Sequence, residues 1–487
     1  MTSLAFWSFL VEKSILPDAT FIQPAPHILF VHGEEKREWL KRRVEKLSKL
    51  PAFAATEYSE DYDTIQKWSG LLCNGRPRSG GEVIAASRHP DGTEVNYGLL
   101  TRHLVQSFGE LGGDVQLLST VTALRQQADK RWLVAVHKAD LTDSNQVVRA
   151  RFVFAGGGGG SLSLLQMAGI PEVQGYGGMP VSGKFLVCQK LDVVEQNLNK
   201  VYGPAAVSAP PMSVPHIDFR SLYGKDVIFF GPFAGFSPML FKVSGTPLDW
   251  LATINWHNVL PMAKMAMSNL PLVKYLIKEI FASKGAQLEA LREFYPAAKP
   301  EDWTMVWAGQ RIQIVNPKGE LQFGTEVLSS KDGTLVGLLG ASPGASVSPQ
   351  IALEVINKFD KGANSAFQWH LALSKWIPCY GRDVNKEPGL YDQIMSKARK
   401  VLLAGNTAGY RSSRVNTAHL FDLIDLDHDG TLTMKEVSKY LLGQGMAKEQ
   451  IQALVNALDT DKSGTISRQE FDEGFGKVVS SLLPKSD

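Results

Sequence analysis

The stretch Phe152-Val-Phe-Ala-Gly-Gly-Gly-Gly-Gly-Ser-Leu-Ser-Leu-Leu-Gln166 decides how this chain is expected to fold. Its apolar run, Phe152 to Ala155, predicts a buried strand of a parallel or mixed sheet. The five glycines that follow allow a sharp turn and a close approach of another group to the backbone. Ser161 is expected to cap the next helix. A strand, a glycine turn and a helix start can together hold a phosphate or a flavin edge, although a tight turn beside a packed helix explains the same residues.

The composition limits the class of protein. A chain of 487 residues is long enough for roughly two to four domains. Its formal net charge of +2 gives no reason to expect a nucleic-acid partner. Cys73, Cys188 and Cys379 are far apart and odd in number, which predicts free thiols in a reducing compartment. No run of eighteen or more apolar residues is present, so a membrane-spanning helix is not expected.

Five further short segments occur in an order and spacing typical of one family. They are Gly92-Thr-Glu-Val-Asn-Tyr-Gly98, Ala209-Pro-Pro-Met-Ser-Val-Pro-His-Ile-Asp218, Gly231-Pro-Phe-Ala234, Ala308-Gly-Gln-Arg-Ile-Gln313 and Leu338-Leu-Gly-Ala-Ser-Pro-Gly-Ala-Ser346. Together with the glycine stretch, they make residues 5 to 400 resemble the malate:quinone oxidoreductases.

The resemblance implies an α/β (α+β) fold. An FAD-binding Rossmann-like domain is expected to run through residues 1–405, with a mixed-sheet substrate domain inserted at about residues 181–310. Family members open with a strand, a GxGxxG turn and a helix that hold the ADP half of FAD, and no such unit precedes Phe6 here. The expected flavin domain is therefore N-terminally incomplete, because Met1 is an internal methionine of a longer protein or because this is a shortened form.

Oxidation of a 2-hydroxy acid needs a base for the hydroxyl proton and a cation that fixes a carboxylate. The resemblance places His216 near the flavin, and in an extended segment Asp218 shares its face and can orient its ring. Arg311 offers a guanidinium that can bind a dicarboxylate bidentately. The alternatives are a histidine satisfied within a sheet and an arginine held in a structural ion pair.

Further contacts to substrate and cofactor follow from the same resemblance. Asn96 and Tyr97 are candidates for substrate binding, although polar residues at a helix start are usually caps. Two strand-to-helix turns are expected to contact FAD. The alternative for the second is an ordinary turn without a ligand. The expected FAD contacts are Gly156, Gly157 and Gly158, and then Gly340, Ser342, Gly344 and Ala345.

The implied reaction is oxidation of (S)-malate to oxaloacetate, with electrons passing through FAD to a membrane quinone. An FAD-linked dehydrogenase of another 2-hydroxy acid, such as L-2-hydroxyglutarate, is the alternative enzyme. The helical stretch from Trp256 to Ser283 carries interspersed lysines and suits a peripheral element on a membrane surface. Packing of these helices against the substrate domain is the favoured interpretation, because amphipathic helices are common.

Two C-terminal segments repeat one metal-binding pattern. Asp425-x-Asp427-x-Asp429-Gly-Thr431-x-x-x-x-Glu436 and Asp459-x-Asp461-x-Ser463-Gly-Thr465-x-x-x-x-Glu470 both fit the twelve-residue EF-hand loop. Their oxygen-bearing side chains and their glycines fall where calcium coordination needs them. The spacing predicts an all-α pair of calcium sites at residues 418–480, after a linker at residues 406–417.

The fusion of EF-hands to a quinone-linked dehydrogenase suggests calcium regulation. It also suggests a mitochondrial enzyme that is peripheral to the inner membrane. A different class remains open: a calcium-binding scaffold whose oxidoreductase body is catalytically silent.

Overall fold

The computed structural model divides the chain into two compact units. The first unit is Met1–Phe219 with Ile228–Thr407, and the second unit is Arg220–Val227 with Ala408–Asp487. The structure describes residues 1–139, 144–204, 214–222, 225–242, 245–280, 282–322, 324–340, 344–362, 369–404, 421, 424–425, 429–443, 448–471 and 473–474. The linker expected at residues 406–417 lies outside these residues.

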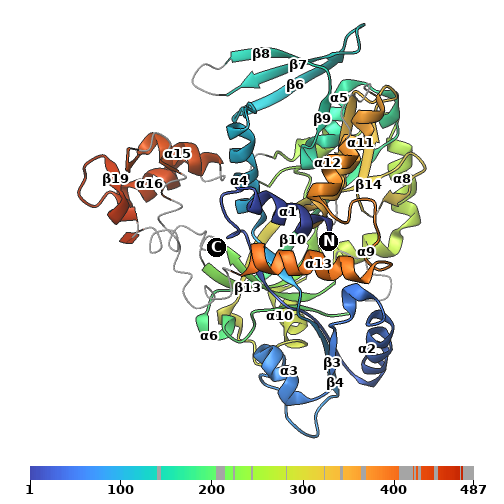
Figure 1. The fold of residues 1–487 in the computed structure, drawn as a ribbon, viewed down its shortest axis with the longest axis vertical. Coiled ribbons are helices and arrows are strands. Elements are labelled where there is room, and N and C mark those ends of the chain that lie inside the picture. Colours follow the sequence, from blue (N-terminus) through green and yellow to red (C-terminus); the bar gives the residue numbers. More distant parts are fainter. Residues whose placement is uncertain are drawn as a thin grey trace. The chain divides into compact units, whose positions relative to one another are not determined.

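A nine-stranded mixed sheet is the largest element of the first unit (Figure 1). Its strand order is β15-β14-β10-β13-β12-β11-β2-β4-β3. In that order the strands are Leu321–Gln322, Thr304–Val315, Gly177–Cys188, Lys225–Gly235, His216–Leu222, Lys200–Tyr202, His27–His32, Ile84–His89 and Glu57–Ser59. Strands β11 and β2 run parallel, whereas β10 pairs antiparallel with both β13 and β14. The sheet therefore joins the expected substrate domain to strands that precede it in the chain.

A three-stranded sheet carries the glycine stretch. Its order is β16 (Glu326–Ser329), β17 (Leu335–Leu339) and β9 (Val153–Ala155), and β17 runs parallel to β9. Helix α5 (Ser161–Ala168) follows β9, and α11 (Ser348–Gly362) follows β17. The strand and helix expected from the glycine stretch are thus confirmed, together with the mixed α/β class.

The expected cap at Ser161 is wrong. Ser161 is the first helical residue of α5, and Gly160 takes the cap position. The Ser161 hydroxyl instead donates a hydrogen bond to the Ala155 carbonyl at 3.1 Å. This bond ties the helix start back to the end of β9.

Helices and two small sheets complete the first unit. The short pair β1 (Ile22–Pro24) and β5 (Thr93–Val95) is antiparallel, and β6 (Ser119–Gln126), β7 (Trp132–Lys138) and β8 (Ser144–Ala150) form an antiparallel sheet. The helices are α1 (Thr2–Glu12), α2 (Glu34–Leu47), α3 (Tyr62–Trp68), α4 (Tyr97–Glu110), α6 (Leu191–Val194), α7 (Leu248–Ala252), α8 (Val259–Ser268), α9 (Leu270–Ile280), α10 (Lys284–Arg292), α12 (Trp369–Trp376) and α13 (Pro388–Ala398). A π-helix, Arg399–Leu403, continues α13.

Two expectations from composition also agree with the structure. All three cysteines are buried and free, as their spacing predicts. None of the helices in the described part of the chain has the length and hydropathy that crossing a lipid bilayer requires.

The second unit has its own apolar core. Its described elements are β18 (Thr431–Thr433), α15 (Met434–Gly443), α16 (Lys448–Leu458) and β19 (Thr465–Ser467). Strand β18 pairs antiparallel with β19, and Leu432 lies opposite Ile466. Both side chains are buried in one cluster with Phe421, Ile424, Val437, Ile451, Leu454, Val455, Leu458 and Phe471.

Candidate functional site

Two glycine turns lie at the same edge of the three-stranded sheet. Because β9 and β17 are parallel neighbours, their carboxyl ends, and the turns that follow, meet at one edge. Gly156, Gly157 and Gly158 are exposed, and a Cβ added to Gly158 would meet no atom within 4 Å. A Cβ on Gly159 would collide with the Leu240 carbonyl oxygen. The first part of the turn is thus open to a ligand, and the second part is packed.

The second turn is only partly described. Gly340 directly follows β17, and Gly344 leads into the short helix Ala345–Val347 that precedes α11. Ser342 lies outside the described residues. A Cβ added to Gly340 would meet the Ile314 side chain at 2.8 Å, so this end of β17 is packed. The open backbone of the first turn, followed by a helix start, fits the polar edge of a flavin or its phosphates.

Arg311 stands on the strand that packs against these turns. It lies in β14 opposite Val181 of β10 and is half-buried. The next residues on its strand, Ile312 and Ile314, pack in one core cluster with Ala155, at the end of β9. Burial lowers the pKa of the Arg311 guanidinium, which still stays protonated at neutral pH. Because successive side chains of a strand lie on opposite faces, Arg311 is on the other face of β14 from Ile312 and Ile314, where its partly buried cation can bind a substrate carboxylate.

His216 and Asp218 share one face of the large sheet, as the alternation along the strand predicts. His216 Nε2 lies 3.5 Å from Asp218 Oδ2, and its Nδ1 lies 2.9 Å from the Val214 carbonyl oxygen. A proton on Nδ1 would be donated to the Val214 carbonyl, which leaves Nε2 on the side of Asp218. The Asp218 contact is longer than the 2.7–2.9 Å usual for charge-assisted bonds.

Sequence reasoning missed the groups that surround this pair. The Lys200 ammonium forms ion pairs with Glu94, at short range, and with Asp218, at 3.6 Å. The Tyr202 ring stacks on His216 at 4.8 Å and, through its other face, on His27 at 4.7 Å. We refer to Glu94, Lys200, Asp218 and His216 as the Lys200 cluster.

The register of three strands explains this assembly. His27 of β2, Lys200 of β11 and Asp218 of β12 lie directly opposite one another. Burial lowers the pKa of His27, and the nearby Asp218 carboxylate acts in the opposite direction. These residues are far apart in the sequence and follow no motif, so only the pairing of the strands could have revealed them.

The two predicted catalytic residues, His216 and Arg311, lie at different positions along the strands of the large sheet. The Phe185 ring lies edge-on to His216 at 5.7 Å, and Phe185 pairs with Val306 of β14. Arg311 is five residues further along β14, which is about 16 Å at 3.3 Å per residue. Along β14, Arg311 is therefore nearer than Val306, the position level with His216, to the residues that pack at the glycine turns.

The side chains of Asn96 and Tyr97 both make contacts that stabilise the fold. The Asn96 side chain accepts a hydrogen bond from the Leu99 amide at 3.0 Å and so caps α4. The Tyr97 ring lies edge-on to Trp7 at 6.4 Å and packs on the core formed with α1. This geometry agrees with the capping alternative.

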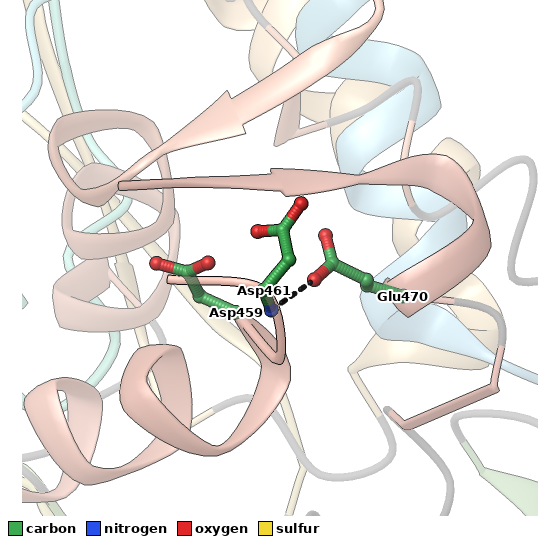
Figure 2. A group of neighbouring side chains, drawn as sticks. All are labelled: Asp459, Asp461 and Glu470. Atoms are coloured by element: carbon green, nitrogen blue, oxygen red, sulfur yellow. Dashed lines mark hydrogen bonds between the residues drawn. The ribbon is translucent and has the colours of Figure 1, made fainter. Parts of the chain in front are cut away.

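The second C-terminal loop gathers oxygen atoms around one point (Figure 2). Carboxylate oxygens of Asp459, Asp461 and Glu470 all lie within 4.8 Å of one another. Ligands at 2.3–2.6 Å from a calcium ion lie at most about 5 Å apart, so the group fits Ca²⁺. Backbone hydrogen bonds, chiefly from the Ser467 amide, lower the pKa of Glu470 to about 2, which keeps it ionised.

The described part of the first loop has the same construction. The Gly430 amide donates to Asp425 Oδ2 at 3.0 Å, and the Gly464 amide donates to Asp459 Oδ2 at the same distance. Both glycines have a positive φ, of 84° and 85°, which a side chain would strain. Asp427 lies outside the described residues, whereas Asp429, Thr431, Glu436, Ser463 and Thr465 lie in the loops where the spacing predicts.

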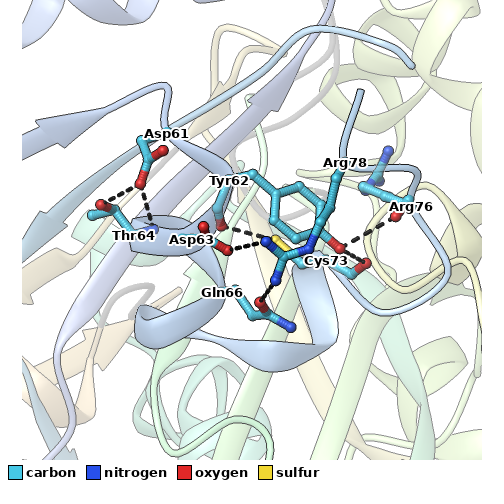
Figure 3. Close-up of polar contacts among 8 residues, drawn as sticks. All are labelled: Asp61, Tyr62, Asp63, Thr64, Gln66, Cys73, Arg76 and Arg78. Atoms are coloured by element: carbon cyan, nitrogen blue, oxygen red, sulfur yellow. Dashed lines mark hydrogen bonds and ion pairs between the residues drawn. The ribbon is translucent and has the colours of Figure 1, made fainter. Parts of the chain in front are cut away.

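A surface pocket of about 560 Å³ lies elsewhere in the first unit and contains none of the predicted site residues. It is lined by charged side chains beside Tyr62, whose hydroxyl donates to the carbonyls of Cys73 and Arg76 (Figure 3). Each lining arginine has a carboxylate partner; for Arg78 this is Asp63, at 2.8 Å. The pocket therefore offers no surplus charge for a ligand.

Comparison with known proteins gives two family matches. The family described as malate:quinone oxidoreductase matches residues 1–403, and the EF-hand domain pair matches residues 417–475. A probable malate:quinone oxidoreductase of Micrococcus luteus is 45% identical over 394 residues, which cover 80% of this chain and 78% of that protein. One from Lysinibacillus sphaericus is 43% identical and covers 82% of this chain and 81% of its own.

Solved structures are more distant. Glycine oxidase from Geobacillus kaustophilus has 14% identity and a TM-score of 0.46, covering 75% of this chain and 79% of its own. The relatives named above are bacterial, so they give no support to the expected mitochondrial location. By sequence, this chain belongs to the malate:quinone oxidoreductase family, with an EF-hand domain pair after its oxidoreductase body.

Proposed function

We propose that this chain oxidises (S)-malate to oxaloacetate and delivers the electrons through FAD to a quinone. Membership of the family supports the reaction. The structural observation that carries the proposal is the packing of β14, the strand that bears Arg311, against the end of β9 and its open glycine turn. The turn could hold a cofactor edge, and Arg311 could hold a substrate carboxylate on the other face of the same strand.

FAD, when bound, supplies the acceptor for the hydride that leaves C2 of malate. The backbone of Gly156, Gly157 and Gly158 would hold it, with Gly340, Gly344 and Ala345 on the second turn. Arg311 would bind a malate carboxylate in bidentate fashion and so fix the orientation of C2. His216, beside Asp218 and Lys200, is the proposed base for the hydroxyl proton. Because it lies at a different position along the strands from Arg311, both residues can act on one malate only if they come closer when the substrate binds.

The first test is the flavin content of the purified chain, followed by malate oxidation with a soluble quinone. We expect stoichiometric FAD and malate-dependent quinone reduction. A chain that takes up no flavin even when FAD is added would favour the silent scaffold. A substrate screen with a dye acceptor separates malate from 2-hydroxyglutarate and other 2-hydroxy acids.

His216→Ala tests the proposed base. Because general-base catalysis contributes about 10²- to 10⁴-fold, turnover should fall by that order while flavin content stays unchanged. His257→Ala, at an exposed histidine, is the matched control. An unchanged rate in His216→Ala would remove this residue from the mechanism, and Arg311 would then be tested by Arg311→Lys, which keeps the charge but loses the fork.

We also propose that the C-terminal loops bind calcium and that calcium regulates the oxidation of malate. The oxygen group of Asp459, Asp461 and Glu470 supports binding. Regulation rests on the fusion alone, and its test is the malate oxidation rate with and without calcium. Equal rates would leave the loops a buffering or docking role.

A further inference from the structure

The Tyr202 ring lies between the rings of two histidines. Its centroid is 4.8 Å from that of His216, with 24° between the ring planes, and 4.7 Å from that of His27, with 21° between the planes. Both contacts are therefore stacked. Strand pairing produces the arrangement, because Tyr202 of β11 lies directly opposite His216 of β12, and β11 pairs on its other side with β2, which carries His27. We refer to these residues as the three-ring stack.

His216 is held on several sides. Its Nδ1 lies 2.9 Å from the Val214 carbonyl oxygen, and its Nε2 lies 3.5 Å from Asp218 Oδ2. The Phe185 ring contacts it in a T-shaped geometry at 5.7 Å, and only 13% of the histidine side chain is exposed. Tyr202 covers one face of the imidazole, so it limits rotation of the ring and keeps Nε2 on the side of Asp218.

The charged groups beside His216 carry a net negative charge. Two carboxylates, Asp218 and Glu94, share one ammonium, that of Lys200. At the other end of the stack, desolvation lowers the pKa of His27, so this ring is neutral at neutral pH. Of the two histidines in the stack, His216 is therefore the one that is placed to carry a positive charge.

The face of an aromatic ring attracts a cation. The face of tyrosine carries partial negative charge, and a cation within about 6 Å of the ring centroid is stabilised by it. His216 becomes a cation when it takes the proton of the malate hydroxyl, and the charge spreads over the imidazole that lies on Tyr202. The stacked contact therefore favours the charged ring over the neutral ring, as a base requires when the proton arrives.

We propose that Tyr202 is a positioning residue for His216: its ring fixes the plane of the imidazole and stabilises the positive charge that the imidazole gains with the proton. The proposal deepens the proposed malate oxidation and rests on it for its purpose, because there His216 is the base. Tyr202 acts through His216 and is assigned no contact with malate. The protonation of His216 needs neither malate nor flavin, so it can be measured separately.

The experiment follows the exchange of the imidazole Cε1 hydrogen for deuterium as a function of pH, by mass spectrometry of peptides from the purified full chain. The midpoint at His216 reports the pH at which this ring gains its proton. Tyr202→Phe keeps the ring face and should leave the midpoint unchanged, whereas Tyr202→Leu should lower it by about half a pH unit. A fluorinated phenylalanine in place of Tyr202 keeps the shape of the ring but withdraws electrons from its face, so the midpoint should also fall.

The matched control is Phe53→Leu, which removes a ring 6.0 Å from His89 and outside the three-ring stack. It should leave the midpoint at His216 unchanged. His103, which is fully buried in α4, should exchange slowly in every variant that is folded. An unchanged midpoint in either Tyr202→Leu or the fluorinated variant, or an equal fall in Tyr202→Phe, would overturn the proposal.

Malate oxidation gives a second measurement. In Tyr202→Leu, kcat should fall about two- to fivefold with little change in KM for malate, and the acid limb of the pH profile should move to lower pH. A fall confined to KM would mean that Tyr202 binds malate directly, and it would overturn the positioning role. A chain that shows the exchange shift but oxidises no malate would refute only the proposed function.

Discussion

The Lys200 cluster and the second C-terminal loop use the same carboxylates in opposite ways. In the cluster, Glu94 and Asp218 are almost fully buried, and the chain itself supplies the cation that compensates them. In the loop, Asp459, Asp461 and Glu470 converge while all three remain at least partly accessible, and the described residues place no lysine or arginine in the group. The comparison shows that the burial and the source of the cation, more than the acids themselves, separate an internally compensated cluster from a metal-binding site.

The largest expected effect comes from removing the internal cation. Lys200→Met would leave Glu94 and Asp218 buried without their cation, so the free energy of unfolding of the body should fall by about 3–5 kcal/mol. Urea denaturation followed by tryptophan fluorescence measures this change. Adding Glu94→Gln to the same variant should restore part of the loss.

The control for this prediction is an exposed ion pair. Lys190 pairs with Asp302 at 3.4 Å, and its side chain is 46% exposed. Lys190→Met should cost far less than Lys200→Met, because exposed pairs are screened by solvent. Equal losses at Lys190 and Lys200 would mean that the cluster is not compensated internally.

A smaller effect is expected from changing the external cation site. Glu470→Gln removes the acidic ligand at position 12 and should weaken calcium binding by about ten- to a hundredfold, as measured by isothermal titration calorimetry. Glu473→Gln, one turn further along and exposed, is the control and should bind calcium normally. If both variants keep full affinity, the group at Glu470 is not a calcium site.

The smallest expected effect concerns His27, which lies in register with Lys200. Desolvation of the ring holds the pKa of His27 below the 6.5 of an unfolded chain, so the unfolded state binds the extra proton below about pH 6.5. His27 therefore destabilises the body as the pH falls, and the effect is small because the residue stays exposed to solvent.

His27→Phe keeps a ring to stack on Tyr202 and should flatten the loss of stability between pH 7 and pH 5. Urea denaturation at several pH values measures the slope. His257→Phe, in the loop between α7 and α8, should leave it unchanged. An unaltered slope in His27→Phe would mean that other groups carry the acid sensitivity.

Sequence reasoning was most successful where the residues that act together are close in the chain. The strand, glycine turn and helix at residues 152–166 fold as predicted, and the alternation along β12 correctly placed His216 beside Asp218. The loop of Asp459 to Glu470 could be predicted because twelve consecutive residues contain the whole group.

Sequence reasoning was least successful where the pairing of distant strands determines which side chains meet. Lys200 belongs to a strand of three residues and meets His27, 173 positions earlier, only because β11 pairs parallel with β2. Ser161 and Asn96 show the limit at the scale of single hydrogen bonds: both begin a helix, yet only Asn96 caps it. The sequence does not tell whether such a side chain caps its helix. The residue at which the helix begins depends on where the preceding strand ends, and this decides which backbone amides are left for the side chain to bind.

The ladder between β18 and β19 has a consequence for how the C-terminal module would respond to calcium. Leu432 and Ile466 join the two loops through backbone pairing at their eighth positions. Binding of an ion that orders one loop therefore lowers the entropic cost of ordering the other loop. The two sites should therefore fill cooperatively, and the module should switch over a narrower range of calcium concentration than two independent sites would.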